Sequence, residues 1–473
     1  MALPPPARRV TDVMNEHPHA PDNDRVSDDH AALFDGPTGV DRRGFLSQLA
    51  GTALFAAGAV PALDAFPTPA ITPGSVFYPN ATDSDAVMFA KARQHFLIPK
   101  GVAYCNTGTL GACPREVVDA LVNGTRLLET NLAAWPYAQA DGEPLTGYQP
   151  SMALREAVGA FLNARADEVA ITQNATISMN FLANGLDLVP GDEVVSTDQE
   201  HGGCISPWRL KAKRYGIVVK ELSLDSATNA GPDGVIKVFA DAMTPRTKAV
   251  MFSQVVSGFG TRLPARELCA MIRDRGALAL VDGAQAVGQM RVDVKDMGCD
   301  AYVASPHKWM MAPKGTGLLF IRRDIQPRYW TTLASSHWDD YEHGSFRFMQ
   351  YGTGAVPLHD GLTAALQFLN RIGVERIERW DTRLTTRLRE GLAKIPSAHV
   401  TSPLHPELAS AITTFRVDGL TAKALQEALW ARRVRVRPQA DVRGVRLSAH
   451  MYMSETDVDT VLDVVAGLRP KRG

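Results

Sequence analysis

The sequence predicts an α/β protein with a mainly parallel sheet in a large domain, followed by a smaller α/β domain at the C-terminal end. Two observations predict this fold class. Short apolar runs alternate with helical patterns from about residue 169 to residue 321, which is typical of parallel strands joined by helices. From Pro357 onward the composition changes to long helical stretches and then a mixed tail, which indicates a second domain.

Length and composition fit such a protein. The chain has 473 residues, enough for two domains; hydrophobic residues make up 45% of it and charged residues 21%. The net charge of −1 gives no reason to expect a nucleic acid or an anionic membrane as partner. The five cysteines form no Cys-x-x-Cys pair, which argues against a metal site or a disulfide scaffold.

The composition of residues 1–66 predicts that this N-terminal region is a leader. Residues 1 to about 40 are rich in Pro, Asp, Asn and His and predict disorder. Arg42-Arg43 then precedes a short apolar run, Leu49 to Val60, and small residues. This pattern is typical of a Tat signal, so we expect the Tat machinery to export the protein to the periplasm or the exterior of a bacterial cell. The alternative is an ordinary amphipathic helix with two surface arginines. The run is shorter than the ~20 residues that a membrane span needs, so no stable span is expected.

Three buried strands and the loops after them form the centre of the pattern. Ala277 to Val281 is an apolar run that ends at Asp282, and Ala301 to Ala304 leads into Ser305-Pro306-His307-Lys308. A third run, Leu318 to Ile321, follows a glycine-containing turn. Because open α/β sheets bind ligands at the carboxyl edge of their strands, Asp282 and Lys308 are expected to converge there.

A carboxylate and a lysine in this arrangement suit pyridoxal phosphate (PLP). A lysine amine can form a Schiff base with this cofactor, and an acid near the pyridine nitrogen keeps that nitrogen protonated. Taken singly, Asp282 could equally cap a helix and Lys308 could be a solvated surface residue.

The whole stretch resembles the signature of class V aminotransferase-fold PLP enzymes. The matching residues are Asp282, Gln285, Gly288, Asp293, Asp300, Ser305, His307, Lys308, Gly315 and Gly317. The resemblance implies the fold type I of PLP-dependent transferases, with Lys308 bonded to the cofactor as a catalytic residue. It also implies that Asp282 pairs with the pyridine nitrogen and that Gln285 contacts the ring hydroxyl. Ser305 and His307 would contact the cofactor phosphate or flank the lysine.

Two further loops belong to the expected cofactor site. A strand, Val169 to Thr172, precedes a helical pattern, and the N-terminus of a helix favours an anion such as phosphate. By the resemblance, Ala175 and Thr176 form the phosphate loop, although Thr176 alone could be a simple N-cap. After the strand Glu193 to Ser196, His201 matches the position of a residue that stacks on the cofactor ring, where an imidazole can also move protons.

Substrate contacts are expected from both ends of the chain. The loop that contains Asn106 resembles the segment that lines the substrate pocket of the family. Arg446 matches the arginine that grips the substrate carboxylate, a task suited to a guanidinium. Gln254 and Ser257 are expected near the cofactor. The other arginines of this region are expected to form a solvated strand face: Arg432, Arg433, Arg435, Arg437 and Arg443.

The segment after the lysine departs from the cysteine desulfurase form of the motif and is closer to the isopenicillin N epimerase-like branch, as are Ser335 to Trp338 and Tyr351 to Gly354. In this fold a glycine-threonine pair reaches the phosphate of the neighbouring subunit's cofactor. Thr353 therefore implies a homodimer with a shared active site, unless it is a simple turn residue.

The sequence thus predicts an exported PLP enzyme that acts at the α-carbon of an amino-acid-like carboxylate. Epimerisation, an isomerase reaction, comes first, with transamination (a transferase reaction) or carbon–sulfur lysis as alternatives. The resemblance implies that a desulfurase would carry its persulfide-forming loop between Arg432 and Ser448. No cysteine lies in that segment, so desulfuration is disfavoured. A different alternative is an exported binding protein without catalysis. The large domain is expected over residues 85–354, with its segment to about residue 113 packing partly on a small domain over residues 355–473.

Overall fold

The computed structural model describes residues 82–132, 151–440 and 442–468. The predicted leader, including Arg42 and Arg43, lies outside the described residues. Within the described ranges, none of the helices combines the length and the apolar composition needed to cross a lipid bilayer.

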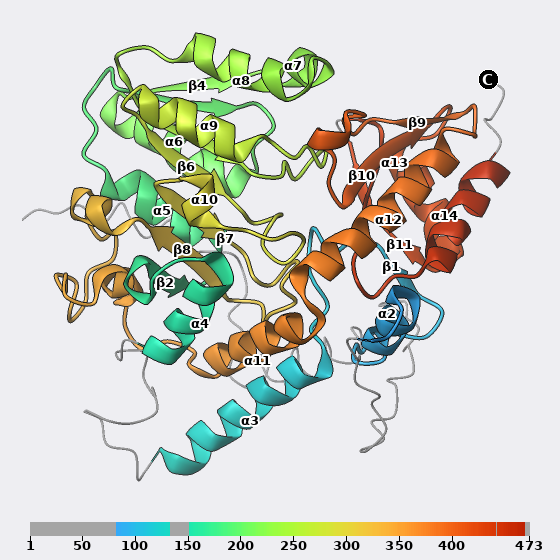
Figure 1. Cartoon of the computed structure of the whole chain (residues 1–473), viewed down its shortest axis with the longest axis horizontal. Helices are drawn as coiled ribbons and strands as arrows, with labels where there is room; N and C mark the ends of the chain where they lie inside the picture. Colours follow the sequence, from blue (N-terminus) through green and yellow to red (C-terminus); the bar gives the residue numbers. More distant parts are fainter. Residues whose placement is uncertain (1–81, 133–150, 441, 469–473) are drawn as a thin grey trace, which may run out of the picture. The chain divides into compact units, whose positions relative to one another are not determined.

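A seven-stranded sheet carries the predicted strands, in the spatial order β2-β8-β7-β6-β5-β3-β4 (Figure 1). Only β8 runs antiparallel to its neighbours, β7 and β2; the other neighbouring pairs are parallel. The prediction of a mainly parallel sheet is therefore confirmed. The strands are β2 (Val169–Thr172), β3 (Glu193–Thr197), β4 (Val218–Leu222), β5 (Thr247–Ser253), β6 (Leu278–Asp282), β7 (Ala301–Ala304) and β8 (Gly317–Ile321).

Helices connect these strands. They are α4 (Met152–Leu162), α5 (Ala175–Gly185), α6 (Gly202–Tyr215), α7 (Asp225–Asn229), α8 (Gly231–Ala242), α9 (Ala265–Asp274) and α10 (Val294–Met297). Short 3-10 turns are η1 (Ala166–Glu168), η2 (Arg323–Arg328) and η3 (Gly344–Met349). Helix α5 begins at Ala175 because the Asn174 side chain accepts a hydrogen bond from the Ile177 backbone N–H (3.0 Å) and so caps the helix. The alternative that Thr176 is the N-cap is therefore wrong.

The C-terminal region forms the expected smaller α/β domain around an antiparallel sheet in the order β12-β13-β10-β9. Its strands are β9 (Ala398–Val400), β10 (Ile412–Val417), β12 (Arg437–Gln439) and β13 (Gly444–Ser448). Two long helices, α11 (Pro357–Ile372) and α12 (Val374–Leu392), lead into it. Helices α13 (Ala422–Ala431) and α14 (Glu455–Gly467) and the turn η4 (Pro406–Leu408) complete it.

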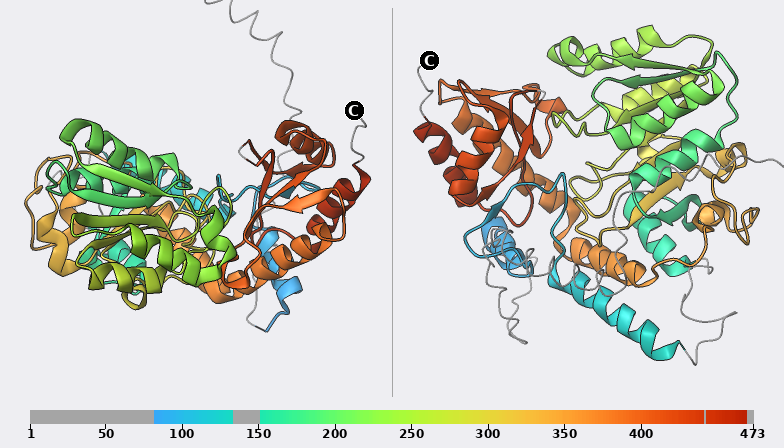
Figure 2. Two further views of the ribbon diagram at one scale, coloured as in Figure 1. Left: turned by 90° about the horizontal axis from the view of Figure 1, so that it is seen from above. Right: turned by 180° about the vertical axis from the view of Figure 1, so that it is seen from behind.

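The N-terminal described segment joins this C-terminal domain, and Figure 1 shows it in blue beside the orange and red elements. Strand β1 (Ala103–Tyr104) pairs in parallel with β11 (Val434–Arg435). Helix α2 (Asp85–Arg93) stacks Phe89 on Trp380 of α12, with ring centroids 4.9 Å apart. After the following loop, helix α3 (Arg115–Asn131) packs against α11; the right view of Figure 2 shows the two side by side.

The loop after β1 reaches both sheets and is the feature that positions the site. Asn106 forms a bridge with Ser448 at the end of β13, and the Gly111 N–H donates to the carbonyl of His307 (2.8 Å). At Gly111 a side chain would overlap the carbonyl oxygen of Lys308, so only glycine allows this close approach. The loop therefore links the predicted lysine to the C-terminal sheet.

Candidate active site

Asp282 and Lys308 lie at the carboxyl ends of β6 and β7, two parallel neighbours in which Asp282 is in register with Val303. Asp282 is only 4% exposed, and its Oδ1 accepts a hydrogen bond from the Ala284 N–H (2.8 Å). Lys308 lies in the turn after β7, where its backbone N–H donates to the Ser305 carbonyl (3.1 Å). The expected convergence at one edge of the sheet is therefore present.

The surroundings of the Lys308 amine favour its action as a nucleophile. It forms no side-chain hydrogen bond or ion pair with any described residue. Burial lowers the pKa of Lys308, the nearby charge of Arg446 lowers it further, and Asp282 opposes the shift. A lower pKa increases the fraction of neutral amine, which is the form that attacks a carbonyl carbon.

The predicted phosphate loop lies next to the lysine turn. The Ala175 N–H, at the start of α5, donates to the Ser305 Oγ (3.0 Å), and Ser305 is 7% exposed. A side chain at Gly203 would clash with the Thr176 hydroxyl, so the starts of α5 and α6 meet closely at this point. Two helix N-termini, with the hydroxyl groups of Thr176 and Ser305 beside them, favour an anion.

His201 caps α6 beside this loop. Its Nδ1 accepts a hydrogen bond from the Gly203 N–H (3.1 Å), so the neutral ring carries its proton on Nε2. Burial and the charge of Lys308 lower the pKa of His201, which favours that neutral form, while Asp282 opposes the shift. His201 can therefore offer an N–H group close to the lysine.

Arg446 lies on β13, fully buried, under the loop after β1. Its Nη1 donates to the Ser257 carbonyl (2.9 Å) and Oγ (3.1 Å), and its Nη2 donates to the Thr109 Oγ1 (2.7 Å). Its Nε is buried without a partner, and no described carboxylate pairs with it. Burial lowers the pKa of Arg446 to about 9, with a smaller effect from Arg437. A buried guanidinium without an anion suits a substrate carboxylate.

Asn106 and Gln285 form hydrogen bonds with the residues that surround Arg446. Asn106 accepts a hydrogen bond from the Thr109 hydroxyl (2.8 Å) and so orients the group that contacts Arg446. Gln285 donates to the Gly108 carbonyl (2.8 Å) and the Ser257 Oγ (3.2 Å) and accepts from the Trp309 indole (2.8 Å). Both amide hydrogens of Gln285 therefore donate to protein groups. The residue connects the loop after β1, through Gly108, to Ser257, which also contacts Arg446.

His307 and Thr353 lie on the other side of the lysine turn. The Nδ1 of His307 is buried without a hydrogen-bond partner, and burial with the charge of Lys308 lowers the pKa of this side chain. Thr353 is exposed between η3 and α11, where it lines a cavity of about 270 Å³ together with Gln173 and Thr316. Its contact with a neighbouring subunit stays a prediction.

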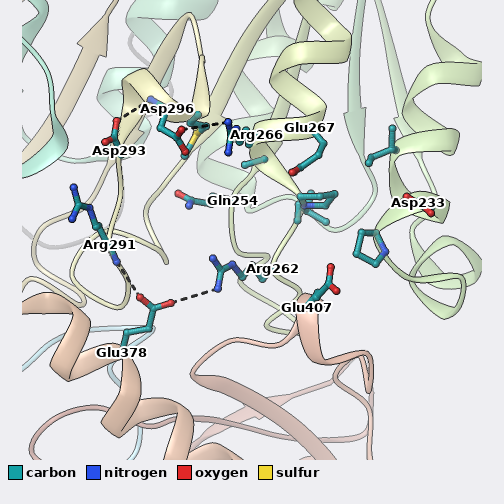
Figure 3. A pocket seen from close by; sticks show the side chains of 16 residues that line it. Asp233, Gln254, Arg262, Arg266, Glu267, Arg291, Asp293, Asp296, Glu378 and Glu407 are labelled. Carbon is teal, nitrogen blue, oxygen red and sulfur yellow. Dashed lines mark hydrogen bonds and ion pairs between the residues drawn. The ribbon is translucent and has the colours of Figure 1, made fainter.

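A surface hollow lined by charged side chains lies elsewhere. It measures about 920 Å³, and many of the side chains that line it are charged (Figure 3). Among them, Glu378 accepts hydrogen bonds from the Arg262 guanidinium and from the Arg291 backbone N–H. Gln254 lies on its wall, and its Oε1 accepts from the Tyr302 hydroxyl (2.6 Å). Both residues expected near the cofactor therefore contact the site described above: the Gln254 backbone N–H donates to the Asp282 carbonyl (2.9 Å), and Ser257 accepts hydrogen bonds from Arg446.

The arginine-rich segment departs from the prediction at one position. Arg432, Arg433, Arg435 and Arg443 are exposed, as expected of a solvated face. Arg437 is half-buried on β12 and lies directly opposite Arg446 of β13. Assigning Arg437 to the solvated face is therefore wrong, because the strand pairing turns it toward the site.

Two buried groups were missed by the sequence reasoning. Glu200 accepts hydrogen bonds from the Ser253 N–H (3.1 Å) and the Thr197 hydroxyl (2.9 Å), and burial raises its pKa to about 7. His450 lies between the Trp309 carbonyl (Nε2, 3.0 Å) and Asp381 (Nδ1, 2.8 Å). The polar loop that follows strand β3 was the available signal for Glu200. The partners of His450 come from distant segments of the chain, so no local pattern in the sequence indicated it.

The assembled groups fit pyridoxal phosphate. An unpaired amine, a buried carboxylate at a strand end, and two helix starts beside the Thr176 and Ser305 hydroxyl groups match its aldehyde, its ring nitrogen and its phosphate.

Comparisons with known proteins agree with this chemistry. The family model described as aminotransferase class-V matches residues 145–461. Isopenicillin N epimerase of Amycolatopsis lactamdurans is 30% identical over 407 residues, which cover 81% of this chain and 99% of that relative. The isopenicillin N epimerase of Streptomyces clavuligerus is 29% identical over 397 residues, with 80% and 98% covered. A probable cysteine desulfurase of Pyrococcus abyssi is 29% identical over 334 residues, with 66% and 82% covered.

Solved structures show the same architecture. The cystine C–S lyase C-DES in complex with cysteine persulfide matches with a TM-score of 0.70 at 27% identity, covering 78% of this chain and 99% of that one. A C-DES variant with glycine covalently linked to its PLP cofactor matches with a TM-score of 0.73 at 27% identity, covering 80% and 99%.

Proposed function

The chain belongs to the class V aminotransferase family of pyridoxal phosphate enzymes, and from this premise we propose that it acts at the α-carbon of an amino acid or amino-acid derivative. Among the possible reactions at this carbon, we favour a proton transfer like that of isopenicillin N epimerase. Lys308 binds the cofactor covalently, Asp282 holds the ring nitrogen, and Ala175, Thr176 and Ser305 hold the phosphate.

The observation that carries this proposal is that Lys308 and Arg446 lie in the same site, close enough for the charge of one to act on the other. Neither side chain forms an ion pair with a described carboxylate, and the charge of Arg446 lowers the pKa of Lys308. A carboxylate held by Arg446 therefore brings the α-carbon of an amino acid near the lysine amine.

The chain's own groups then handle the proton. Bound PLP withdraws electrons from the α-carbon and so makes its proton acidic. Lys308 takes or returns that proton at Nζ, and its lowered pKa favours this exchange. His201 offers Nε2 as a second proton-carrying group. The loop from Asn106 to Gly111 packs against the lysine turn, where the Gly111 N–H donates to the His307 carbonyl.

Two relatives support epimerisation as the first choice, because the similarity to isopenicillin N epimerases extends over 99% and 98% of their lengths. Carbon–sulfur lysis is the second choice, supported by the similarity to the C–S lyase C-DES. Transamination stays a further alternative on the same scaffold, and an exported binding protein without catalysis is the alternative of a different class.

Isotope exchange tests the proposal. The PLP-loaded protein is incubated in D₂O with a panel of D- and L-amino acids, and deuterium at the α-carbon is measured together with the chirality of the product. Exchange with inversion supports epimerisation, 2-oxo acid formation supports transamination, and release of a sulfur-containing product supports lysis. Lys308→Ala must abolish exchange. Absence of exchange for every amino acid, with spectral evidence that they bind, would favour the binding protein.

Assembly and location complete the proposal. We propose a homodimer in which Thr353 reaches the partner's cofactor phosphate, and export through the Tat machinery directed by Arg42 and Arg43. Sedimentation of the loaded protein tests the dimer. Changing both arginines to lysine tests export: retention of the variant inside cells that release the wild type supports the signal, and equal release contradicts it.

A further inference from the structure

Arg437 and Arg446 form an unusual cross-strand pair. The antiparallel register of β12 and β13 places them directly opposite each other, so that both side chains lie on the same face of the sheet. Like charges in such a position are destabilising. Neighbouring arginines avoid this cost by being exposed, whereas Arg437 is half-buried and Arg446 is fully buried.

No described carboxylate compensates this pair. Neither guanidinium takes part in an ion pair, and no hydrogen bond of the Arg437 side chain is present among the described residues. The Arg446 Nε and the Ser448 Oγ are both buried without partners. Ser448 lies two positions after Arg446 on β13 and therefore shares its face. Unpaired buried donors that gather on one face point to an anionic ligand.

The cofactor phosphate does not account for both arginines. The groups that suit the phosphate come from the start of α5 and from Ser305, at the carboxyl edge of the large sheet. Arg437 and Arg446 come from the C-terminal sheet, yet the charges of both reach Lys308 and His201. They therefore flank the region where a substrate lies beside the lysine amine.

We propose that Arg437 binds a second anionic group of the substrate, while Arg446 binds the α-carboxylate. The preferred substrates are then amino acids or amino-acid derivatives with another carboxylate, or an equivalent oxyanion, in the side chain. This inference rests on the proposed function and narrows its substrate class. Arg437 is a specificity-determining residue in this account.

Binding of two unreactive acids tests the inference. Glutarate carries two carboxylates, and butyrate is the same chain with one carboxylate replaced by hydrogen; neither has an amino group that could react with the cofactor. Calorimetric titration of the PLP-loaded wild type should give about 10- to 100-fold tighter binding of glutarate, the size expected of charge-assisted hydrogen bonds.

Variants assign the preference to one residue. Arg437→Gln should remove most of the preference for glutarate over butyrate. Arg437→Lys should keep part of this preference, because the charge stays while the planar guanidinium is lost. Arg432→Gln, which makes the same charge change at an exposed arginine, should leave it unchanged.

Equal binding of the two acids by the wild type overturns the inference, and so does an unchanged preference in Arg437→Gln. The wild-type comparison decides the question even if a variant does not fold. The titration requires no turnover, so a failed inference is distinguishable from a failed enzymatic function, which the isotope exchange tests.

Discussion

Glu200 gives a prediction with a definite sign. Burial raises the pKa of this carboxyl from the ordinary 4.5 to about 7, the charge of Asp282 adds to the shift, and hydrogen bonds from Ser253 and Thr197 oppose it. Between these two pH values the folded protein keeps a proton that the unfolded chain has lost. The corresponding stability is therefore fully present below about pH 4.5 and is lost as the pH rises to about 7.

The magnitude follows from the same two values. One pKa unit corresponds to about 1.4 kcal/mol, so the free energy of unfolding should fall by about 3 kcal/mol across the window because of Glu200. Glutamine has the same shape and does not ionise. Its carbonyl can accept from the Ser253 N–H, and its amide can donate to the Ser253 hydroxyl, as a protonated carboxyl would.

Urea unfolding of wild type and Glu200→Gln between pH 4.5 and pH 7.5 measures the effect. The two proteins should be similar in stability at pH 4.5, and the variant should be more stable by about 3 kcal/mol at pH 7.5. Other titrating groups cancel in this difference. Glu390→Gln, at an exposed glutamate, is the control and should show no trend. A difference between wild type and Glu200→Gln that stays constant with pH would refute the reasoning.

Three further changes probe the site. His450→Ala leaves Asp381 buried without its partner and should lower the free energy of unfolding by about 3–5 kcal/mol, measured by urea unfolding; a loss below ~1 kcal/mol would contradict this account. Gly111→Ala drives a methyl group into the Lys308 carbonyl and should weaken cofactor binding in a fluorescence titration, whereas unchanged binding would mean that the loop does not press on the lysine turn. Arg446→Gln should reduce kcat/KM about 100-fold for any carboxylate substrate, and a purely structural role would instead lower the melting temperature without this loss.

Local patterns were enough to predict the sheet and much of the candidate site. Strands β2 and β7 begin and end at the expected residues because each is a short apolar run followed by polar loop residues. Asp282 and Lys308 could be placed at one edge because the ends of parallel neighbouring strands meet there. The contact of Ala175 with Ser305 agrees with the expected phosphate loop in position.

The features that the sequence did not predict depend on contacts between residues far apart in the chain. Six arginines between residues 432 and 446 look alike locally, and only the register of β12 against β13 turns Arg437 toward Arg446. The engagement of Gln285 depends on Gly108 and Trp309, which come from different parts of the chain. The shifted pKa of Glu200 depends on β5, which supplies the Ser253 contacts and helps to enclose the carboxyl.

Reduction of the PLP-loaded protein with borohydride, followed by mass spectrometry of its peptides, tests the central claim most directly. Borohydride converts the bond between a lysine and the cofactor into a stable one. The account predicts one phosphopyridoxyl group per chain, on Lys308, and none in Lys308→Ala. Modification of a different lysine, or none after loading with the cofactor, would contradict the assignment of this site.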